Sequence, residues 1–459
     1  MAESGDNRNV SESTTNHQFK NILTHRRQVL RSGAAAAATG GLASIAGCSG
    51  GGSGDVETLN LLMEDVLDTQ ILEEVIPEYE EQSGVEINIE TFPYGGLRET
   101  AVTQLRSPES EYDLMQIDTA WFGEFVSGEL LQPLDDRIDD ASTISRDVYT
   151  DPVWNAVGEF NGTAYTLPYY NYAYGFLYRD DLLNDPDLQS EYESEVGGEL
   201  TVPDGIEEYV EMSQFMTRDT NGDGENDMWG AAMQGQAGIW ILDEWLPYFY
   251  ALGGDYTENG EVVFGDHLDT AVEAIELYAE NINNAAPESA KSWGFNQASE
   301  FMAGGEAFSM MTYNWMFQRL SDSDVGSDLG IANVPGGVPI LGVWGLGIPH
   351  NIPSEARADA VWDFLSWAES PNIRKERASQ GAAPTSTDTL TDDELTESFS
   401  DHYPALLEIL ENGEPLPNMA GANEINDILG TALNRIITED ADPQSTLSSA
   451  ADDMEAALE

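Results

Sequence analysis

The residues that decide the fold class are 56-VETLNLLMEDVLDTQILEEVIPEYEEQSGVEINIETF-92. Residues 56–63 carry the leucines of an apolar strand, and the apolar residues of 68–82 recur at the i, i+4 spacing of an amphipathic helix. In residues 85–89 apolar and polar side chains alternate, which predicts a second strand. A helix over 97–105 and a third strand over 112–117 continue the pattern. This alternation indicates an α/β lobe with a mainly parallel sheet.

The ends of these strands are candidate binding positions, because ligands of open α/β sheets lie beyond the carboxyl ends of the strands. Asp65 follows the first strand, and Asp118 and Trp121 follow the third. We predict that all three contact a ligand. For Trp121 the alternative is a core position at the start of a helix that also carries Phe122 and Phe125.

Tyrosines crowd residues 165–172, where four of the eight residues are Tyr. Because each buried hydroxyl needs a hydrogen-bond partner, a core would not hold so many, and some should face a wet cleft. We therefore predict that Tyr170, Asn171 and Tyr172 bind a ligand. Residues 56–459 are also too many for one ordinary core, so two lobes are expected.

Residues 1–47 have the layout of an export signal. Arg26 and Arg27 precede a short apolar run, which resembles a twin-arginine signal, although the residue before the pair departs from the usual Ser or Thr. The run Ile-Ala-Gly-Cys that ends at Cys48 resembles a lipobox, and lipid on this cysteine would tether the protein to the outer face of the membrane. A secretory leader with a chance cysteine is the alternative. Residues 48–55, rich in Gly and Ser, predict a flexible tether.

The chain is strongly acidic, with 84 Asp and Glu against 18 Lys and Arg and a formal net charge of −66. Such a charge repels itself in ordinary salt, but at molar salt the Debye length falls to ~3 Å and the repulsion is screened. We therefore predict a protein of a halophilic archaeon. Aromatic residues make up 9% of the chain, which excludes an acidic disordered protein. Nucleic acid is a poor partner for this charge.

Residues 219–227, DTNGDGEND, match the start of a calcium-binding loop, with Gly at position 6 for the tight turn. The candidate ligands of a structural calcium ion are Asp219, Asn221, Asp223, Glu225 and Asp227. Position 12 is Gly230, where an EF-hand places a bidentate Glu. Either a distant carboxylate completes the shell, or the segment is an Asx-rich turn without a metal.

Several stretches occur in the order found in one family of transport proteins. Besides the lipobox they are residues 128–134, 165–183, 307–315, 342–349, 360–370 and 412–418. With them the chain resembles the extracellular solute-binding proteins of ABC importers, in the family that includes maltodextrin-binding proteins. The resemblance implies a two-lobed, periplasmic-binding-protein-like (type II) α/β fold, with a hinge of crossing strands and a central ligand cleft.

The resemblance also implies boundaries. The crossing strands would lie near 167–171, 308–314 and 343–348. The first lobe would be 56–168 plus 313–345, and the second lobe 169–312 plus 346–459.

The same resemblance nominates Trp240 and Asp243 at the beginning of a helix, and Trp315 as a sugar-stacking ring. Tyr313 lies beside Trp315 in a strand with a polar, aromatic end. Trp344 stands among glycines that would let its ring approach a ligand, and a core position has equal weight. Aromatic rings suit the C–H face of a pyranose, while Asp, Asn and Tyr hydrogen-bond its hydroxyls.

We therefore predict a monomeric, lipid-anchored binding protein that captures a sugar outside the cell by lobe closure, delivers it to an ABC permease and catalyses no reaction. The main alternative is a solute-binding protein for a polyamine, a peptide or an amino-acid-like ligand, which aromatic rings and carboxylates would also suit. Ferric iron binding through Tyr169 and Tyr170 lacks a nearby histidine. A glycosidase would need two carboxylates ~5 to 9.5 Å apart, for which the sequence gives no positive signal.

Overall fold

The computed structural model describes residues 56–258, 261–320, 323, 325–399, 402–417, 419 and 421–458. The predictions for the export signal with Arg26 and Arg27, for Cys48 and for the tether lie outside the described residues. Within these residues, none of the helices has the length and hydrophobicity that crossing a bilayer requires.

The first sheet has the strand order β2-β1-β3-β14-β6. Its strands are β1 (Thr58–Glu64), β2 (Glu86–Phe92), β3 (Leu114–Asp118), β6 (Thr166–Asn171) and β14 (Val343–Gly347). β1 pairs in parallel with β2 and β3, whereas β14 is antiparallel to β3 and β6. The predicted strands at 56–63, 85–89 and 112–117 are confirmed as β1, β2 and β3.

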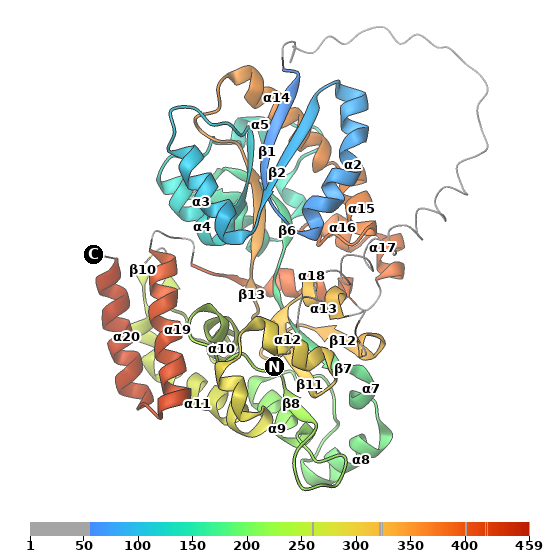
Figure 1. The fold of residues 1–459 in the computed structure, drawn as a ribbon, viewed down its shortest axis with the longest axis vertical. Helices are drawn as coiled ribbons and strands as arrows, with labels where there is room; N and C mark the ends of the chain where they lie inside the picture. The colour runs from blue at the N-terminus through green and yellow to red at the C-terminus, as the bar shows by residue number, and fades with distance from the viewer. Residues whose placement is uncertain are drawn as a thin grey trace, which may run out of the picture. The chain divides into compact units, whose positions relative to one another are not determined.

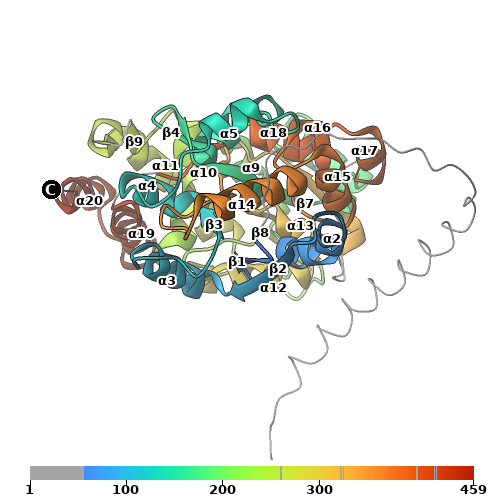
Figure 2. The same cartoon turned by 90° about the horizontal axis from the view of Figure 1, so that it is seen from above.

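Amphipathic helices cover this sheet and close what we call the first core. α2 (Leu67–Ser83) buries Leu72 and Ile76 on one face and ends at Gly84, whose φ of 75° suits glycine. The other helices around this core are α3 (Tyr94–Leu105), α4 (Thr119–Ser127), α5 (Asp135–Asp140), α6 (Asp151–Val153), α14 (Glu355–Ala368), α15 (Pro371–Ser379), α16 (Thr387–Leu390), α17 (Asp393–Ser398) and α18 (Tyr403–Asn412). Figure 2 shows α14 close to the strands of the first sheet, and α14 contacts β1.

The second sheet has the order β12-β7-β11-β8, with β7 (Tyr174–Arg179), β8 (Trp229–Ala231), β11 (Ala307–Tyr313) and β12 (Leu329–Ala332). One face meets the second core, which includes α8 (Pro186–Glu195), α9 (Ile206–Met216), α10 (Ile239–Ala251), α11 (Leu268–Ala285), α19 (Ala422–Glu439) and α20 (Pro443–Ala457). α12 (Phe295–Ala303) and α13 (Trp315–Leu320) belong to a smaller cluster that includes Leu177 and Met310 of the sheet. Figure 1 shows these helices gathered around the lower sheet.

Short elements complete the chain. They are β4 (Glu159–Phe160), β5 (Thr163–Ala164), α7 (Asp180–Leu183), β9 (Thr257–Glu258), β10 (Glu261–Val262), β13 (Ile340–Leu341) and β15 (Glu414–Pro415).

The chain passes from the first sheet to the second between β6 and β7, next to the first predicted crossing. The predicted crossing at 308–314 is wrong, because β11 pairs with β7 and β8 inside the second sheet. The chain returns from β12 of the second sheet to β14 of the first sheet directly before residue 343, next to the predicted crossing at 343–348. Both β11 and β14 are apolar and almost fully buried, and that pattern does not specify which sheet a strand joins.

The two cores also divide the chain differently from the predicted lobe boundaries. β12 lies within 313–345, which was assigned to the first lobe, but it pairs with β7 of the second sheet. α14 and α15 lie within 346–459, which was assigned to the second lobe, but their apolar residues belong to the first core. Apolar periodicity predicts which face of a helix is buried and leaves open which core receives it.

Candidate functional site

Strand pairing brings several predicted residues to one edge of the first sheet. β1, β2 and β3 run in parallel, so their carboxyl ends, at Glu64, Phe92 and Asp118, lie at the same edge. β14 starts at this edge because it is antiparallel to β3, and Trp344 lies opposite both Asp118 and Tyr170. This is the edge at which open α/β sheets bind ligands.

The second sheet brings a second group of aromatic residues to the same region. Tyr313 at the end of β11 pairs with Tyr174 at the start of β7. The amide of Asn314 donates to the carbonyl of Ala173 at 2.8 Å, and the amide of Tyr172 donates to the carbonyl of Gly342 at 2.8 Å. The crossing segment between β6 and β7 thus joins the edges of the two sheets.

Nine aromatic rings form one connected series across these two edges, which we call the aromatic chain. Its members are Tyr94, Trp121, Tyr170, Tyr172, Trp240, Phe295, Tyr313, Trp315 and Trp344. Seven of the nine, all but Tyr94 and Phe295, were predicted from the sequence to bind a ligand. The ring contacts therefore bring together every aromatic residue of the predicted site.

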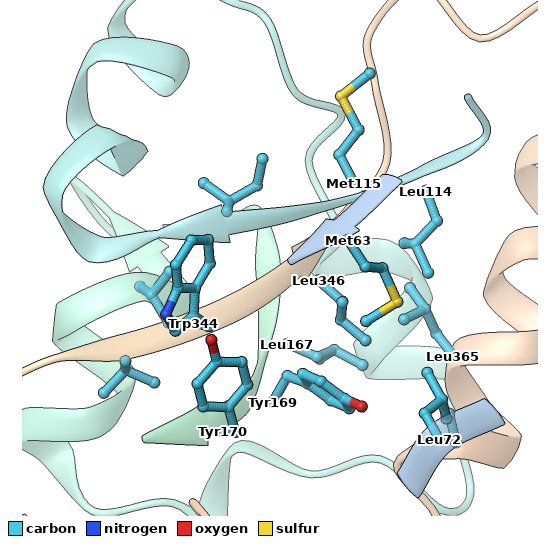
Figure 3. Packing of buried hydrophobic residues seen from close by; sticks show 14 of the residues in the cluster. Met63, Leu72, Leu114, Met115, Leu167, Tyr169, Tyr170, Trp344, Leu346 and Leu365 are labelled. Carbon is cyan, nitrogen blue, oxygen red and sulfur yellow. The ribbon is translucent and has the colours of Figure 1, made fainter. Parts of the chain in front are cut away.

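Trp344 is the centre of the aromatic chain on the first sheet. Its ring centroid lies 5.2 Å from that of Trp121, 5.9 Å from those of Tyr94 and Tyr170, and 6.5 Å from that of Tyr172. Figure 3 shows the ring of Tyr170 beside Trp344, while the neighbouring Tyr169 points toward Leu72. Successive strand residues point to opposite faces, so Tyr169 is a core residue and Tyr170 belongs to the aromatic chain.

Tyr172 connects the rings of the first sheet with those of the second sheet. Its ring lies 5.7 Å from Tyr313, which in turn lies 6.3 Å from Phe295. Phe295 contacts Trp315 at 5.1 Å and Trp240 at 5.8 Å. Two rings at opposite ends of the aromatic chain are open to solvent, since the side chain of Tyr94 is 47% exposed and that of Trp315 is 38% exposed. Exposed large aromatic side chains beside buried ones are typical of a binding surface.

Three tyrosines of the aromatic chain donate hydrogen bonds to three carboxylates. The hydroxyl of Tyr170 donates to Glu64 at 2.6 Å, and that of Tyr172 donates to Asp118 at 2.5 Å. On the second sheet the hydroxyl of Tyr313 donates to Oδ2 of Asp243. Polar acceptors thus lie beside the rings in both sheets.

Burial weakens the acidity of these carboxylates. It raises the pKa of Glu64 to about 7, that of Asp118 to about 6 and that of Asp243 to about 7, although the tyrosine hydrogen bonds oppose the shift. Burial also raises the pKa values of the three partner tyrosines well above 10, so the phenols keep their protons and act as the donors. Above neutral pH the three carboxylates are therefore charged acceptors.

Among the described residues, the carboxylates that bind tyrosine hydroxyls form no ion pair with a lysine or an arginine. Within the described residues, the ion pairs of lysines and arginines all go to other carboxylates, for example Arg98 to Glu124 and Arg357 to Asp113. Glu64, Asp118 and Asp243 therefore have no basic partner among these ion pairs. The site combines apolar ring faces with uncompensated acceptors, and this suits a ligand that brings its own hydrogen-bond donors.

Residues 65–375 match the family model described as bacterial extracellular solute-binding protein. The chain belongs to this family. A binding protein of Brucella abortus (strain 2308) is 23% identical over 404 residues, which are 84% of this chain and 89% of the relative.

Solved structures of solute-binding proteins share the fold. An ABC transporter solute-binding protein from Agrobacterium radiobacter K84, in complex with ribitol, superposes with a TM-score of 0.71 at 25% identity, over 88% of this chain and 98% of that one. Maltose-bound MalE3 of T. maritima gives a TM-score of 0.70 at 21% identity, over 87% and 99% of the two chains. The predicted two-lobed type II α/β fold is thereby confirmed.

Two predicted residues of this solute-binding protein stand apart from the aromatic chain. Asp65 is exposed, and its neighbour Glu64 is the residue that bonds to Tyr170. Asn171 is 1% exposed, with Nδ2 donating to the carbonyl of Pro384 at 2.7 Å and Oδ1 accepting from Asn314. Because both ends of this amide have protein partners, Asn171 holds the crossing segment in place and is poorly placed to contact a ligand.

Glu64, Tyr94 and Phe295 were not among the predicted ligand-binding residues. Tyr94 stands in the turn after β2, and an aromatic residue at the tip of a Gly-rich turn beyond a strand end was a usable signal. Glu64 is the last residue of β1. Asp65 was predicted in its place, because the sequence does not show which of two successive residues points toward the site. Phe295 starts α12, and its sequence gives no signal that links it to the site.

We expect replacement of Asn171 with alanine to lower the stability of the solute-binding protein by about 1–3 kcal/mol, because Asn314 and the carbonyl of Pro384 lose their buried partner. Denaturant unfolding measures this change. The affinity for solute, compared at a temperature where both proteins are folded, should change far less than stability does. A loss of affinity without a loss of stability would restore Asn171 as a contact residue.

The residues of the predicted calcium loop form hydrogen bonds with one another. Oδ1 and Oδ2 of Asp219 accept from the amides of Gly222 and Gly224, and Oδ1 of Asp227 accepts from Thr220. No group of three or more His, Cys, Asp or Glu is arranged to hold a metal within the part of the chain that the structure describes. These contacts favour the Asx-rich turn. Calcium stays a prediction, and a chelator would lower the melting temperature if the ion were structural.

Proposed function

We propose that this protein captures an uncharged carbohydrate or sugar alcohol outside the cell and delivers it to the permease of an ABC transporter. The ligand site comprises the aromatic chain with Glu64, Asp118 and Asp243. Asp65 and Asn171 belong to its surroundings. The protein binds its solute without chemical change, as a solute-binding family implies.

One observation carries the proposal: the rings that join the edges of the two sheets are bordered by three carboxylates that already bind tyrosine hydroxyls. Ring faces complement the C–H faces of sugars, and the carboxylate and phenol oxygens accept from sugar hydroxyls. Similar proteins were solved with ribitol and with maltose, which supports the same ligand class here.

A thermal-shift panel in molar KCl tests the proposal. We expect sugars or sugar alcohols to raise the melting temperature, because a ligand that binds only the folded state stabilises it by RT ln(1 + [L]/Kd), ~2.7 kcal/mol at 100-fold excess over Kd. Calorimetric titration of the best ligand then gives the affinity. A panel in which only polyamines or peptides stabilise the protein would exclude a sugar ligand.

The second candidate is a cationic solute such as a polyamine. The observation that favours it is the lack of a basic partner for Glu64, Asp118 and Asp243 beside rings that can make cation–π contacts. Against it stands the raised pKa of all three carboxylates, which reduces the charge available to hold a cation at neutral pH. The polyamine arm of the same panel separates the two.

We further propose that the protein is a monomeric lipoprotein of a halophilic archaeon, exported through the twin-arginine pathway and anchored at Cys48. The acidic composition, with 84 Asp and Glu, supports the halophilic origin. Mass spectrometry of the membrane-bound protein tests for a lipid on Cys48. A Cys48→Ser variant should be released into the medium, while an Arg26→Lys, Arg27→Lys variant should remain inside the cell.

A further inference from the structure

We propose that the aromatic chain selects uncharged, donor-rich solutes and rejects the anionic derivative of the same sugar, such as a uronate, an aldonate or a sugar phosphate. This inference rests on the proposed function, because it narrows the ligand class of the same site. It follows from the direction of the hydrogen bonds at the site and from the lack of basic partners.

Three of the four tyrosine hydroxyl hydrogens in the aromatic chain are already used. Tyr170, Tyr172 and Tyr313 each donate their single hydroxyl hydrogen to a carboxylate. A phenol that has donated its hydrogen can offer a ligand only its oxygen lone pairs. At these three positions the protein therefore accepts hydrogen bonds and cannot donate them.

One acceptor also remains unpaired. Asp243 is 0% exposed, and its Oδ1 has no hydrogen-bond partner in the described part of the chain, while Oδ2 binds Tyr313. A buried carboxylate oxygen without a donor is costly, so a ligand that donates to it gains affinity. Hydroxyl groups can do this, whereas a carboxylate or phosphate on the ligand cannot.

The negative charge of the three carboxylates repels an anionic group of a ligand that binds next to them. The ion pairs of the described lysines and arginines leave Glu64, Asp118 and Asp243 without a basic partner. An anionic group would lie beside these carboxylates with nothing to neutralise it. The overall charge of −66 is screened at molar salt, but contacts from which water is excluded are screened much less. The rejection should therefore persist in molar KCl.

Matched pairs of ligands test the inference by calorimetric titration at pH 8 in molar KCl. The pairs are maltose with maltobionate, glucose with glucuronate, and mannitol with mannitol 1-phosphate. For every neutral member that binds, we expect the anionic partner to bind on the order of 100-fold more weakly. Equal affinity within a pair would overturn the inference and leave the proposed function standing. If no neutral sugar or sugar alcohol binds, both fail.

Variants locate the source of the selectivity. Asp243→Asn replaces one acceptor oxygen with a donor NH2 group. It should therefore lower the affinity for the neutral ligand and reduce the difference in affinity between the neutral and the anionic member of a pair. Glu64→Gln, at a partly exposed position, gives a second test if Asp243→Asn fails to fold. Glu124→Gln is the matched control, because Glu124 pairs with Arg98 and makes no bond to the aromatic chain in the described contacts. Unchanged selectivity in both site variants would contradict the inference.

Discussion

Replacing Trp344 with alanine is expected to weaken solute binding on the order of 100-fold or more, and to cost about 3–5 kcal/mol of stability. Trp344 is 3% exposed and its ring contacts those of Tyr94, Trp121, Tyr170 and Tyr172. Removing it takes away the ring that contacts four of the other eight members of the aromatic chain. Binding should therefore fall even if the variant folds. Calorimetric titration with the best ligand of the thermal-shift panel measures the affinity.

Two further variants separate binding from folding. Trp344→Phe keeps a ring at the same position and should retain most of the stability with a smaller loss of affinity. Trp362→Ala removes a half-buried tryptophan of α14 that packs against the first core, so it should lower stability and leave affinity unchanged. Wild-type affinity in a folded Trp344→Ala protein would show that the aromatic chain is not the binding site.

The sequence predicted the local elements well, for a physical reason. The strands β1 to β3 and the helices α2 and α10 each bury one face or one apolar run, so their apolar residues recur at the period of the element. The same reasoning placed Tyr170 and Trp344 in strands that end near a site. Trp121 and Trp344 are both buried, as a core position would require, and both are in ring contact with the exposed Tyr94, so a role in ligand binding stays a prediction for each.

What the sequence could not predict depends on contacts between distant residues. β11 and β14 are both short, apolar and buried, and only tertiary pairing assigns them to different sheets. Asn171 looked like a ligand contact because its partners, Asn314 and Pro384, come from far along the chain. Phe295 joins the aromatic chain from the start of α12 for the same reason. Periodicity carries no information about such partners.

Glu244 is expected to make the protein less stable as pH rises, and Glu244→Gln to remove this loss. The carboxylate lies on α10 with 0% exposure, accepts from the amide of Gln234 and from Tyr278, and leaves Oε1 without a partner among the described residues. Burial raises its pKa from 4.5 to about 8, although the hydrogen bonds oppose the shift. In this core the neutral acid is therefore the favoured form.

The sign follows from proton binding. A carboxyl whose pKa is raised by folding holds its proton in the folded state between pH 4.5 and 8, whereas the unfolded chain has lost it. The stability that Glu244 gains from its proton is fully present below pH 4.5. It is lost progressively as pH rises toward 8, and the loss in the free energy of unfolding is roughly 5 kcal/mol for a pKa shift of this size. Glu64, Asp68 and Asp243, with pKa values raised to about 7, act in the same direction.

Denaturant unfolding of the wild type and of Glu244→Gln, from pH 5 to pH 9 in molar KCl, measures the part of the pH dependence of stability that is due to Glu244. Glutamine keeps the acceptor for the amide of Gln234 and cannot ionise, so the variant and the wild type should be within about 1 kcal/mol at pH 5. The variant should become the more stable of the two by several kcal/mol at pH 9. In the control variant Glu276→Gln, on the exposed side of α11, the free energy of unfolding should change with pH as it does in the wild type. Equal pH slopes for Glu244→Gln and Glu276→Gln would mean that the buried carboxylate is ionised in the folded protein, held by a partner that the neighbouring side chains do not supply.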